Sequence, residues 1–246
     1  MQVLKAISLL REYLFPGGCA VCGRILLDPE EAWYGLCGDC RDFFTIDCGD
    51  RCVSCGKPLI SEKERCLPCR EGEGHSFDAA FVLYPYTGRY RTLLQAYKFG
   101  LYRPLGNFFA DKLAEALSLF KPYPEGKPSW VPVPPRPGKI RKTGWDQVEY
   151  LAGRLEAGTK RNRGNNQFPP VYRCLKRLPS KSQKELNREN RKINLRGRIV
   201  CVKPPPAEVL LLDDVFTTGA TLDACATALK EGGAQRVYAI SLFYDL

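Results

Sequence analysis

Short apolar runs alternate with amphipathic stretches through most of the chain. Five runs have the length and composition of strands, and they cover residues 77–86, 129–134, 198–202, 209–212 and 236–243. Between them, apolar residues recur at helical spacing in residues 89–99, in residues 107–120 and in the segment that begins at Gln147. Strands that alternate with helices are typical of an α/β fold with a parallel sheet, in which ligands bind at the carboxyl ends of the strands. We predict this fold for the larger part of the chain.

The first 75 residues follow a different pattern. A short packing helix is predicted by one helical face, made of Leu4, Ile7, Leu10 and Leu14. Charged residues interrupt this segment, so no signal peptide is expected, and the absence of any run of eighteen apolar residues predicts no membrane span. The polar stretch of residues 71–75 predicts a domain boundary, with one domain at residues 1–74 and another at residues 75–246. His75, the only histidine of the chain, falls in this stretch and is interpreted as a linker residue.

Nine of the twelve cysteines lie between residues 19 and 69. Eight of them form four CxxC pairs, namely Cys19/Cys22, Cys37/Cys40, Cys52/Cys55 and Cys66/Cys69. Each pair supplies two thiolates on one tight turn, and two such turns complete a tetrahedral Zn²⁺ site. Disulfides would need an oxidising compartment, a redox CxxC is expected singly, and the paired spacing favours zinc over an iron–sulfur cluster. The prediction is structural Zn²⁺, one ion or two because the second interval is short, with Cys48 left as a spare or buried thiol.

The run at residues 209–212 ends in two carboxylates, Asp213 and Asp214. A polar turn follows, made of Thr217, Thr218, Gly219, Ala220 and Thr221, and it opens into an amphipathic segment. A strand, a turn and a helix in this order aim backbone N–H groups and the positive end of the helix at one point, which suits a phosphate. The aspartates can accept hydrogen bonds from vicinal hydroxyls or hold a hydrated Mg²⁺, so the string describes a ribose phosphate site. A strand end before a capped helix accounts for the Asp-Asp pair alone, but not for the whole string.

The formal charge of +10 is unevenly distributed. Residues 1–75 hold 9 Lys and Arg against 12 Asp and Glu, whereas residues 139–203 hold 18 against 5. This concentration predicts a polyanionic ligand, nucleic acid, or both, with a solvated surface as the alternative. Four cations in the loop after the strand at residues 129–134 are placed to hold a pyrophosphate, namely Arg136, Lys139, Arg141 and Lys142.

The basic segment also carries aromatic residues and a polar stretch. Its aromatic residues are Trp145, Tyr150, Phe168 and Tyr172. They are compatible with stacking on nucleic-acid bases, although aromatic residues lie more often in a core. Residues 173–198 alternate basic and small polar residues. They are interpreted as a flap that closes over a substrate or as a DNA-binding arm, with a solvated loop as the alternative.

The string VLLLDDVFTTGAT at residues 209–221 resembles the signature of type I phosphoribosyltransferases that binds phosphoribosyl pyrophosphate (PRPP). Together with the cysteine pairs, the strings YKFG, VPVP, GKIRKTGWDQVEYLA, LKRL and SQKELNRENRKINLRG resemble the ComF family, which is competence-associated, phosphoribosyltransferase-like and carries an N-terminal double zinc ribbon. The resemblance covers nearly the whole chain. In the basic loop the family usually has an arginine and an asparagine where this chain has Thr143 and Asp146.

The resemblance implies a type I phosphoribosyltransferase-like sheet and a site for PRPP with Mg²⁺. In that site Asp213 and Asp214 are the catalytic carboxylates that contact the ribose hydroxyls, and residues 217–221 hold the 5-phosphate. It also implies a cytoplasmic role in natural transformation, in which the protein handles incoming single-stranded DNA with a helicase partner.

Two functions follow from these expectations. The first is transfer of the phosphoribosyl group from PRPP to a nitrogen acceptor, which needs positioning, charge neutralisation and exclusion of water rather than a covalent nucleophile. The second is a non-catalytic single-stranded DNA adapter, with PRPP as ligand or regulator. A glutamine amidophosphoribosyltransferase is not expected, because that activity needs an amidohydrolase domain with a terminal cysteine, and this chain starts with Met1 and Gln2 ahead of the cysteine pairs.

Overall fold

The computed structural model describes residues 17–59, 64–72, 74–120, 128–161, 169–179 and 197–245. The helix predicted near the N-terminus lies outside these residues. So do Phe168 and residues 180–196, which make up most of the predicted flap.

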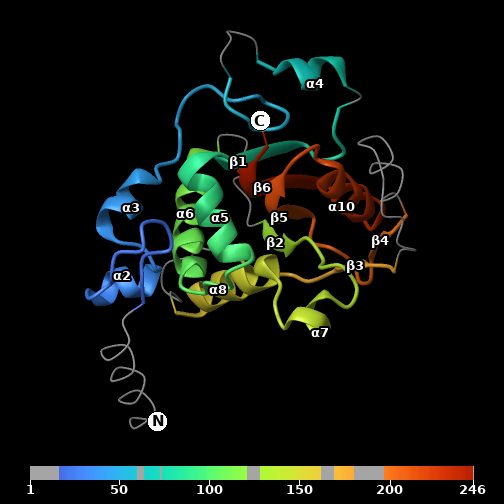
Figure 1. Ribbon diagram of the computed structural model, residues 1–246. Helices are drawn as coiled ribbons and strands as arrows, with labels where there is room; N and C mark the ends of the chain where they lie inside the picture. The colour runs from blue at the N-terminus through green and yellow to red at the C-terminus, as the bar shows by residue number, and fades with distance from the viewer. Residues whose placement is uncertain are drawn as a thin grey trace.

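A four-stranded parallel sheet forms the centre of the molecule (Figure 1). Its strands, in spatial order, are β1 (Ala79–Pro85), β6 (Arg236–Tyr244), β5 (Glu208–Phe216) and β2 (Ser129–Pro132). All three neighbouring pairs run parallel, which confirms the α/β prediction. The middle strands are buried along almost their whole length, as continuous apolar runs in a parallel sheet require.

Helices and a small second sheet cover the two faces of the central sheet. One face carries α5 (Gly88–Lys98), α6 (Leu105–Leu119) and α8 (Gln147–Arg161). The other face carries α10 (Ala220–Glu231) and an antiparallel pair, β3 (Leu175–Arg177) with β4 (Ile199–Cys201). Strand β3 was not predicted, because its three residues are too few for a periodic signal. The short helix α7 (Lys139–Thr143) follows β2 in the basic loop.

Strand β5 is longer than the apolar run that predicted it. Its backbone continues through the two aspartates, and Asp213, Val215 and Phe216 are aligned with Ser241, Phe243 and Tyr244 of β6. The expectation that the strand stops at Leu212 is therefore wrong. Backbone pairing does not depend on side-chain polarity, so a change from apolar to acidic residues does not mark the strand's end.

The position of the aspartates within a strand sets their directions. Successive side chains of a strand point to opposite faces, and Leu212 belongs to the core under α5, α6 and α8 while Leu211 belongs to the core under α10. Asp214 therefore faces the three-helix side and Asp213 faces α10.

The described residues of the N-terminal module form turns and three short helices, α2 (Pro29–Tyr34), α3 (Gly38–Phe43) and α4 (Leu67–Glu71). Its first half packs on α6, where Phe44 is fully buried with its ring centroid 6.0 Å from that of Phe108. Its second half lies against β1, where the Arg51 guanidinium donates to the Val82 carbonyl oxygen at 2.8 Å. The two halves of the module therefore rest on different parts of the sheet domain.

Candidate functional site

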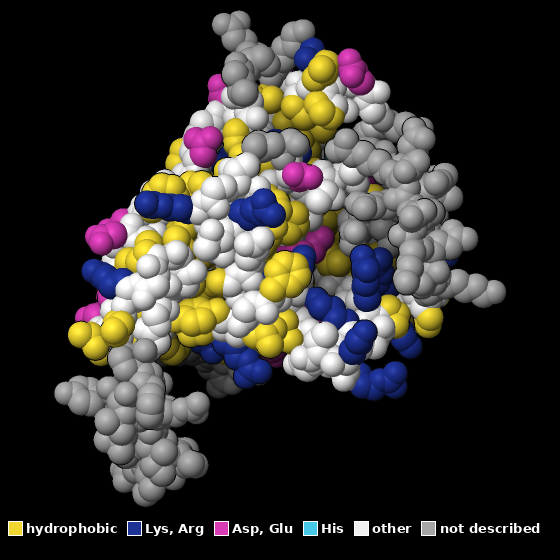
Figure 2. All heavy atoms as spheres, viewed as in Figure 1, with side chains coloured by type: hydrophobic (Ala, Val, Ile, Leu, Met, Phe, Trp, Pro, Cys, Tyr) yellow, Lys and Arg dark blue, Asp and Glu magenta, His cyan; other side chains and the backbone are white. Residues whose placement is uncertain are grey.

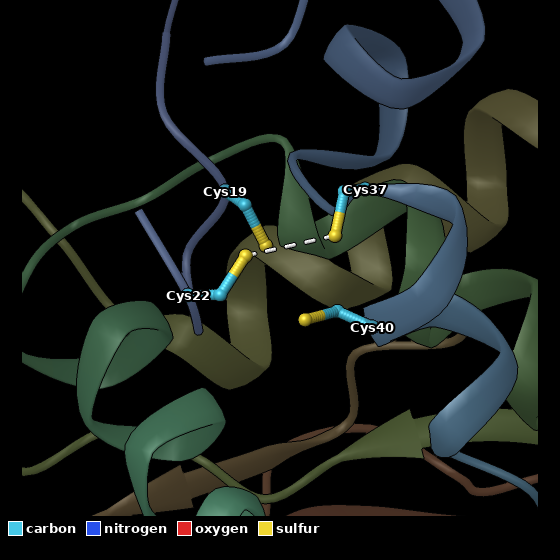
Figure 3. Close-up of side chains that lie close together, drawn as sticks. All are labelled: Cys19, Cys22, Cys37 and Cys40. Carbon is cyan, nitrogen blue, oxygen red and sulfur yellow. Dashed lines mark hydrogen bonds between the residues drawn. The ribbon is translucent and has the colours of Figure 1, made fainter. Parts of the chain in front are cut away.

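Four cysteine sulfurs converge in the first half of the N-terminal module. Cys19, Cys22, Cys37 and Cys40 place all their sulfur atoms within 4.8 Å of one another, and those of Cys22 and Cys37 are 3.6 Å apart (Figure 3). A tetrahedral zinc ion with Zn–S bonds of about 2.3 Å separates its sulfur ligands by about 3.8 Å. The first group therefore fits one Zn²⁺.

The second half of the module repeats the arrangement. The group consists of Cys52, Cys55, Cys66 and Cys69, whose sulfur atoms also lie within 4.8 Å of one another, with those of Cys55 and Cys66 3.7 Å apart. The short interval between its two CxxC pairs left the number of zinc sites open. The geometry supports two structural zinc sites rather than one.

The first cysteine of each group is surrounded by backbone donors. Burial disfavours the thiolate of Cys19, yet the N–H groups of Cys22, Cys37 and Val21 lower its pKa to about 7. Cys52 has the same environment and a pKa of about 7. Burial raises the pKa of Cys69 to about 11. Thiolates clustered in this way need a cation to balance their charge, which a tetrahedral zinc ion supplies.

Cys48, the ninth cysteine of this region, is exposed, so the alternative of a buried thiol is wrong. Its sulfur lies 3.5 Å from the carbonyl oxygen of Ile46 and belongs to neither group.

The turn between β5 and α10 has the geometry of an anion cradle. Gly219 has φ of 77° and caps the helix, whose first residue is Ala220. The Ala220 N–H lies 3.4 Å from the Thr218 hydroxyl oxygen, and the Thr217 side chain is exposed to solvent. The first N–H groups and the positive end of a twelve-residue helix therefore meet beside two threonine hydroxyls.

Asp214 is held by two polar partners on the three-helix face. The Lys98 ammonium lies 2.5 Å from its Oδ2, and the Gln147 amide donates to the same oxygen at 2.6 Å. Burial acts to raise the pKa of Asp214, but Lys98 and Gln147 outweigh it and hold that pKa below its ordinary value. Asp214 is therefore ionised and fixed.

Asp213 has a different environment on the α10 face. Full burial and the neighbouring charge of Asp214 raise its pKa well above the ordinary value. Its Oδ1 accepts a hydrogen bond of 2.8 Å from the Asp214 N–H. The pKa values of the two adjacent carboxylates are therefore shifted in opposite directions, because Lys98 and Gln147 contact Asp214, whereas burial and the charge of Asp214 dominate at Asp213.

The basic loop divides its four cations between two roles. Lys139 turns inward and donates to Asp146 and Gln147, at 2.6 Å each. Arg136, Arg141 and Lys142 are exposed and form no ion pair with a carboxylate that the structure describes. Figure 2 shows Lys and Arg side chains gathered over the part of the surface that contains α7. Three of the four predicted cations are therefore available to an anion.

The two departures from the family pattern have structural roles. Asp146 accepts from the N–H groups of Val148 and Glu149 with its Oδ1, and so caps α8, while its Oδ2 binds Lys139. The Thr143 hydroxyl donates to the Lys139 carbonyl oxygen at 2.9 Å. Both residues hold the loop in shape.

The aromatics of the basic segment belong mainly to the core. Trp145 is 6% exposed, and its ring lies 5.7 Å from Tyr97 and 4.7 Å from Tyr150. The Tyr172 ring is covered by the Lys203 ammonium at 4.0 Å. Base stacking by Trp145 is therefore not supported, and the core alternative holds for it.

Several residues at the site were not predicted individually. Lys98 and Gln147 lie in the YKFG and GWDQ strings, but no spacing rule connects them to Asp214. Burial and the nearby charges of Arg136 and Arg198 lower the pKa of Arg177, and Asp213 lies close to it. One terminal nitrogen of Arg198 is buried without a hydrogen-bond partner among the described residues. Arg177 therefore interacts electrostatically with Asp213 and with two further guanidinium groups.

His75 is not the linker residue that the polar stretch predicted. Its imidazole stacks on Phe77 with centroids 4.4 Å apart, and its Nδ1 lies 3.0 Å from an Asp223 carboxylate oxygen. The expectation was wrong because Phe77 and α10 cover the ring from outside its own segment.

Within the described ranges, none of the helices combines the length and apolar character that a bilayer crossing requires.

The comparisons with known proteins agree with the cysteine geometry and extend over most of the chain. A family model for the double zinc ribbon domain matches residues 10–70. The chain is 30% identical over 241 residues to competence protein ComFC of Streptococcus pneumoniae (strain ATCC BAA-255 / R6), and the match covers 91% of this chain and 98% of that protein. The chain belongs to the ComF family.

Two further relatives are similar over most of their length. Competence protein ComFC of Bacillus subtilis (strain 168) is 27% identical over 237 residues, which cover 93% of this chain and 90% of that protein. Competence protein F of Haemophilus influenzae (strain ATCC 51907 / DSM 11121 / KW20 / Rd) is 24% identical over 216 residues, which cover 82% of this chain and 87% of that protein. The resemblance to the ComF family and the double zinc ribbon are confirmed.

Proposed function

We propose that this protein binds PRPP together with Mg²⁺ at the carboxyl end of β5, and that it acts in the cytoplasm in DNA uptake during natural transformation. The role in competence is carried over from the names of the relatives. The PRPP site is supported by one observation above all: a buried carboxylate pair leads directly into the anion cradle at the start of α10.

Each part of PRPP has a matching group in the site. The backbone N–H groups and hydroxyls of residues 217–221 would hold the 5-phosphate. Asp213 and Asp214 would accept hydrogen bonds from the ribose hydroxyls. Arg136, Arg141 and Lys142, which are exposed, would attract the pyrophosphate, together with Arg177, which interacts with Asp213.

The aspartates and the ligand phosphates would also hold Mg²⁺, which prefers carboxylate and phosphate oxygens. When bound, this ion neutralises charge on the pyrophosphate group. The fixed and ionised Asp214, held by Lys98 and Gln147, keeps its carboxylate in one orientation for such a ligand.

Transfer of the phosphoribosyl group would follow from this binding mode. The bond between C1 of ribose and the pyrophosphate oxygen breaks, a bond from C1 to the acceptor nitrogen forms, and pyrophosphate leaves with the bonding electrons. The acceptor nitrogen gives up one proton, which passes to the released pyrophosphate or to solvent. The chain's own contribution is to position the sugar, to neutralise the leaving group with Arg and Lys, and to exclude water.

The second candidate is a non-catalytic adapter that binds single-stranded DNA with a helicase partner and takes PRPP as a regulator. The exposed cations of α7 and the surplus of 18 Lys and Arg over 5 Asp and Glu in residues 139–203 favour it. Adapter function predicts single-stranded DNA binding that weakens steeply with added salt, because cation–phosphate contacts release counterions.

Release of pyrophosphate from Mg²⁺–PRPP, with nucleobases and ammonia as pooled acceptors, distinguishes the two candidates. Acceptor-dependent release establishes the transferase. Binding of PRPP without release of pyrophosphate supports the non-catalytic adapter.

The site itself is tested by the double variant Asp213→Asn/Asp214→Asn, which replaces both carboxyl groups where the ribose and Mg²⁺ would bind. We expect it to lose PRPP binding while it retains its zinc content and its unfolding transition. The matched control, Asp39→Asn/Asp42→Asn, makes the same replacement at exposed positions of the first zinc ribbon and leaves binding unchanged. If the site variant binds PRPP as tightly as the wild type, the assignment of Asp213 and Asp214 to the PRPP site is wrong.

A further inference from the structure

The segment that leads from the second cysteine group into β1 is attached to the first turns of α10. The Ser76 N–H donates to Asp223 Oδ1 at 2.8 Å, and the Thr227 hydroxyl donates to the Ser76 hydroxyl oxygen at 3.0 Å. Asp223 and Thr227 both belong to α10, the helix whose N-terminus forms the anion cradle. The connection between the zinc module and the sheet is therefore in direct contact with the helix that carries the candidate site.

His75 lies between two polar groups in this contact. Its Nε2 lies 3.9 Å from the sulfur of Cys69, and its Nδ1 lies 3.0 Å and 3.2 Å from the two carboxylate oxygens of Asp223. The side chains of His75 and Asp223 are only 12% and 19% exposed. One ring thus joins a zinc ligand to the first turn of α10, and hydrogen bonds of a ligand sulfur to its surroundings help to orient it.

The imidazole of His75 also contacts the candidate anion cradle at Gly219. A Cβ atom at Gly219 would lie 2.9 Å from His75 Cε1 and 3.1 Å from Phe216 Cζ, so the backbone of the turn rests directly on the imidazole. Phe77 stacks on the same ring, with 14° between the two planes. The path from the Cys69 sulfur to the Gly219 backbone therefore consists of a single packed side chain.

We propose that His75 is a positioning residue that couples metal occupancy of the second cysteine group to the geometry of the loop at residues 217–221. When zinc fixes Cys69, its sulfur and Asp223 hold the ring in one place, and the ring holds Gly219. When zinc is absent, the sulfur no longer has a fixed position and the ring loses one of its two supports. The identity of the loop's ligand as PRPP rests on the proposed function, whereas the coupling does not.

Hydrogen exchange of the amides of residues 217–221 in the full, zinc-loaded chain tests the coupling without any ligand. His75→Phe keeps an aromatic ring on Phe77 but removes both polar contacts, and Cys69→Ser disturbs the second metal site alone. We expect each to speed exchange of the loop amides about tenfold, a typical size for coupling between two sites, and the double variant to be no faster than either. Lys230→Met is the matched control, because it breaks another contact of α10 with the same segment, to Asp78, at the far end of the helix. It should leave loop exchange unchanged.

A purely structural role for His75 predicts a different result, in which the effects of His75→Phe and Cys69→Ser add. Additive effects, or wild-type exchange in His75→Phe, would overturn the proposal. If Cys69→Ser does not fold, loop exchange in the wild type and in His75→Phe is compared with and without a zinc chelator. The coupling then predicts that His75→Phe speeds exchange in the zinc-loaded protein but not in the zinc-free protein.

A second readout is PRPP affinity, which should fall about tenfold in His75→Phe at unchanged zinc content. A wild-type protein that binds no PRPP would contradict the proposed function, and the exchange experiment would still decide the coupling.

Discussion

The two cysteine groups have the same ligands and nearly the same spacing between sulfurs, but different neighbours. The first lies in a ribbon that packs on α6, where the Tyr34 hydroxyl donates to Asp111 at 2.6 Å. The second lies beside β1 and α10, and one of its sulfurs faces His75. The first group therefore stabilises a contact remote from β5, whereas the second is in contact with the candidate site. Two sites with the same ligands therefore differ in which part of the sheet domain they contact.

The largest expected effects come from removing one ligand of each group. Cys37→Ser and Cys55→Ser should each reduce the zinc content from two ions per chain to one, because three thiolates hold zinc far less tightly than four. Only Cys55→Ser should also weaken PRPP binding, since among the described contacts it is the second group that reaches the loop, through His75. Zinc analysis and PRPP titration of both variants measure the difference, and equal loss of affinity in the two would erase the distinction between the groups.

A large loss of stability is expected where the first ribbon docks on α6. Phe44 is fully buried, and its ring contacts those of Phe108 and Tyr84. Phe44→Ala should lower the free energy of unfolding by about 3–5 kcal/mol, through lost burial and the cavity left behind. Denaturant unfolding checks this value. Leu27→Ala, at a position 81% exposed in the same ribbon, is the control and should change little.

A smaller effect is expected where the second ribbon meets β1. A Cβ atom at Gly56 would lie 2.2 Å from the Ala80 carbonyl oxygen, and Gly56 also has φ of 71°. Gly23 has φ of 76° in the first ribbon, with open space around its Cβ position. Gly23→Ala should cost about 1–2 kcal/mol from the backbone conformation alone.

Gly56→Ala should cost more than Gly23→Ala in the same unfolding experiment, because the clash with β1 adds to the strain. Equal costs would contradict a close contact between Gly56 and the Ala80 carbonyl oxygen.

The ligands of the zinc sites and the core of the candidate site were predictable from the sequence. The CxxC pairs and the string from Asp213 to Thr221 are local, so residues close in sequence carry the whole signal. The parallel strands were predictable because burial on both faces leaves continuous apolar runs.

The contacts between distant segments were not predictable. Lys98 reaches Asp214 across 116 positions, and His75 reaches Asp223 across 148. Neither pair has a spacing or a composition that a single sequence displays. His75 was assigned to a linker because its neighbours in sequence are polar, whereas its neighbours in space are Phe77, Phe216 and α10.

Calorimetric titration of Mg²⁺–PRPP into the zinc-loaded protein tests the central claim most directly. The account predicts saturable binding of one PRPP per chain in the wild type, and no binding in Asp213→Asn/Asp214→Asn. The absence of binding to a wild-type protein that holds two zinc ions would contradict it, as would equal binding to the wild type and the variant.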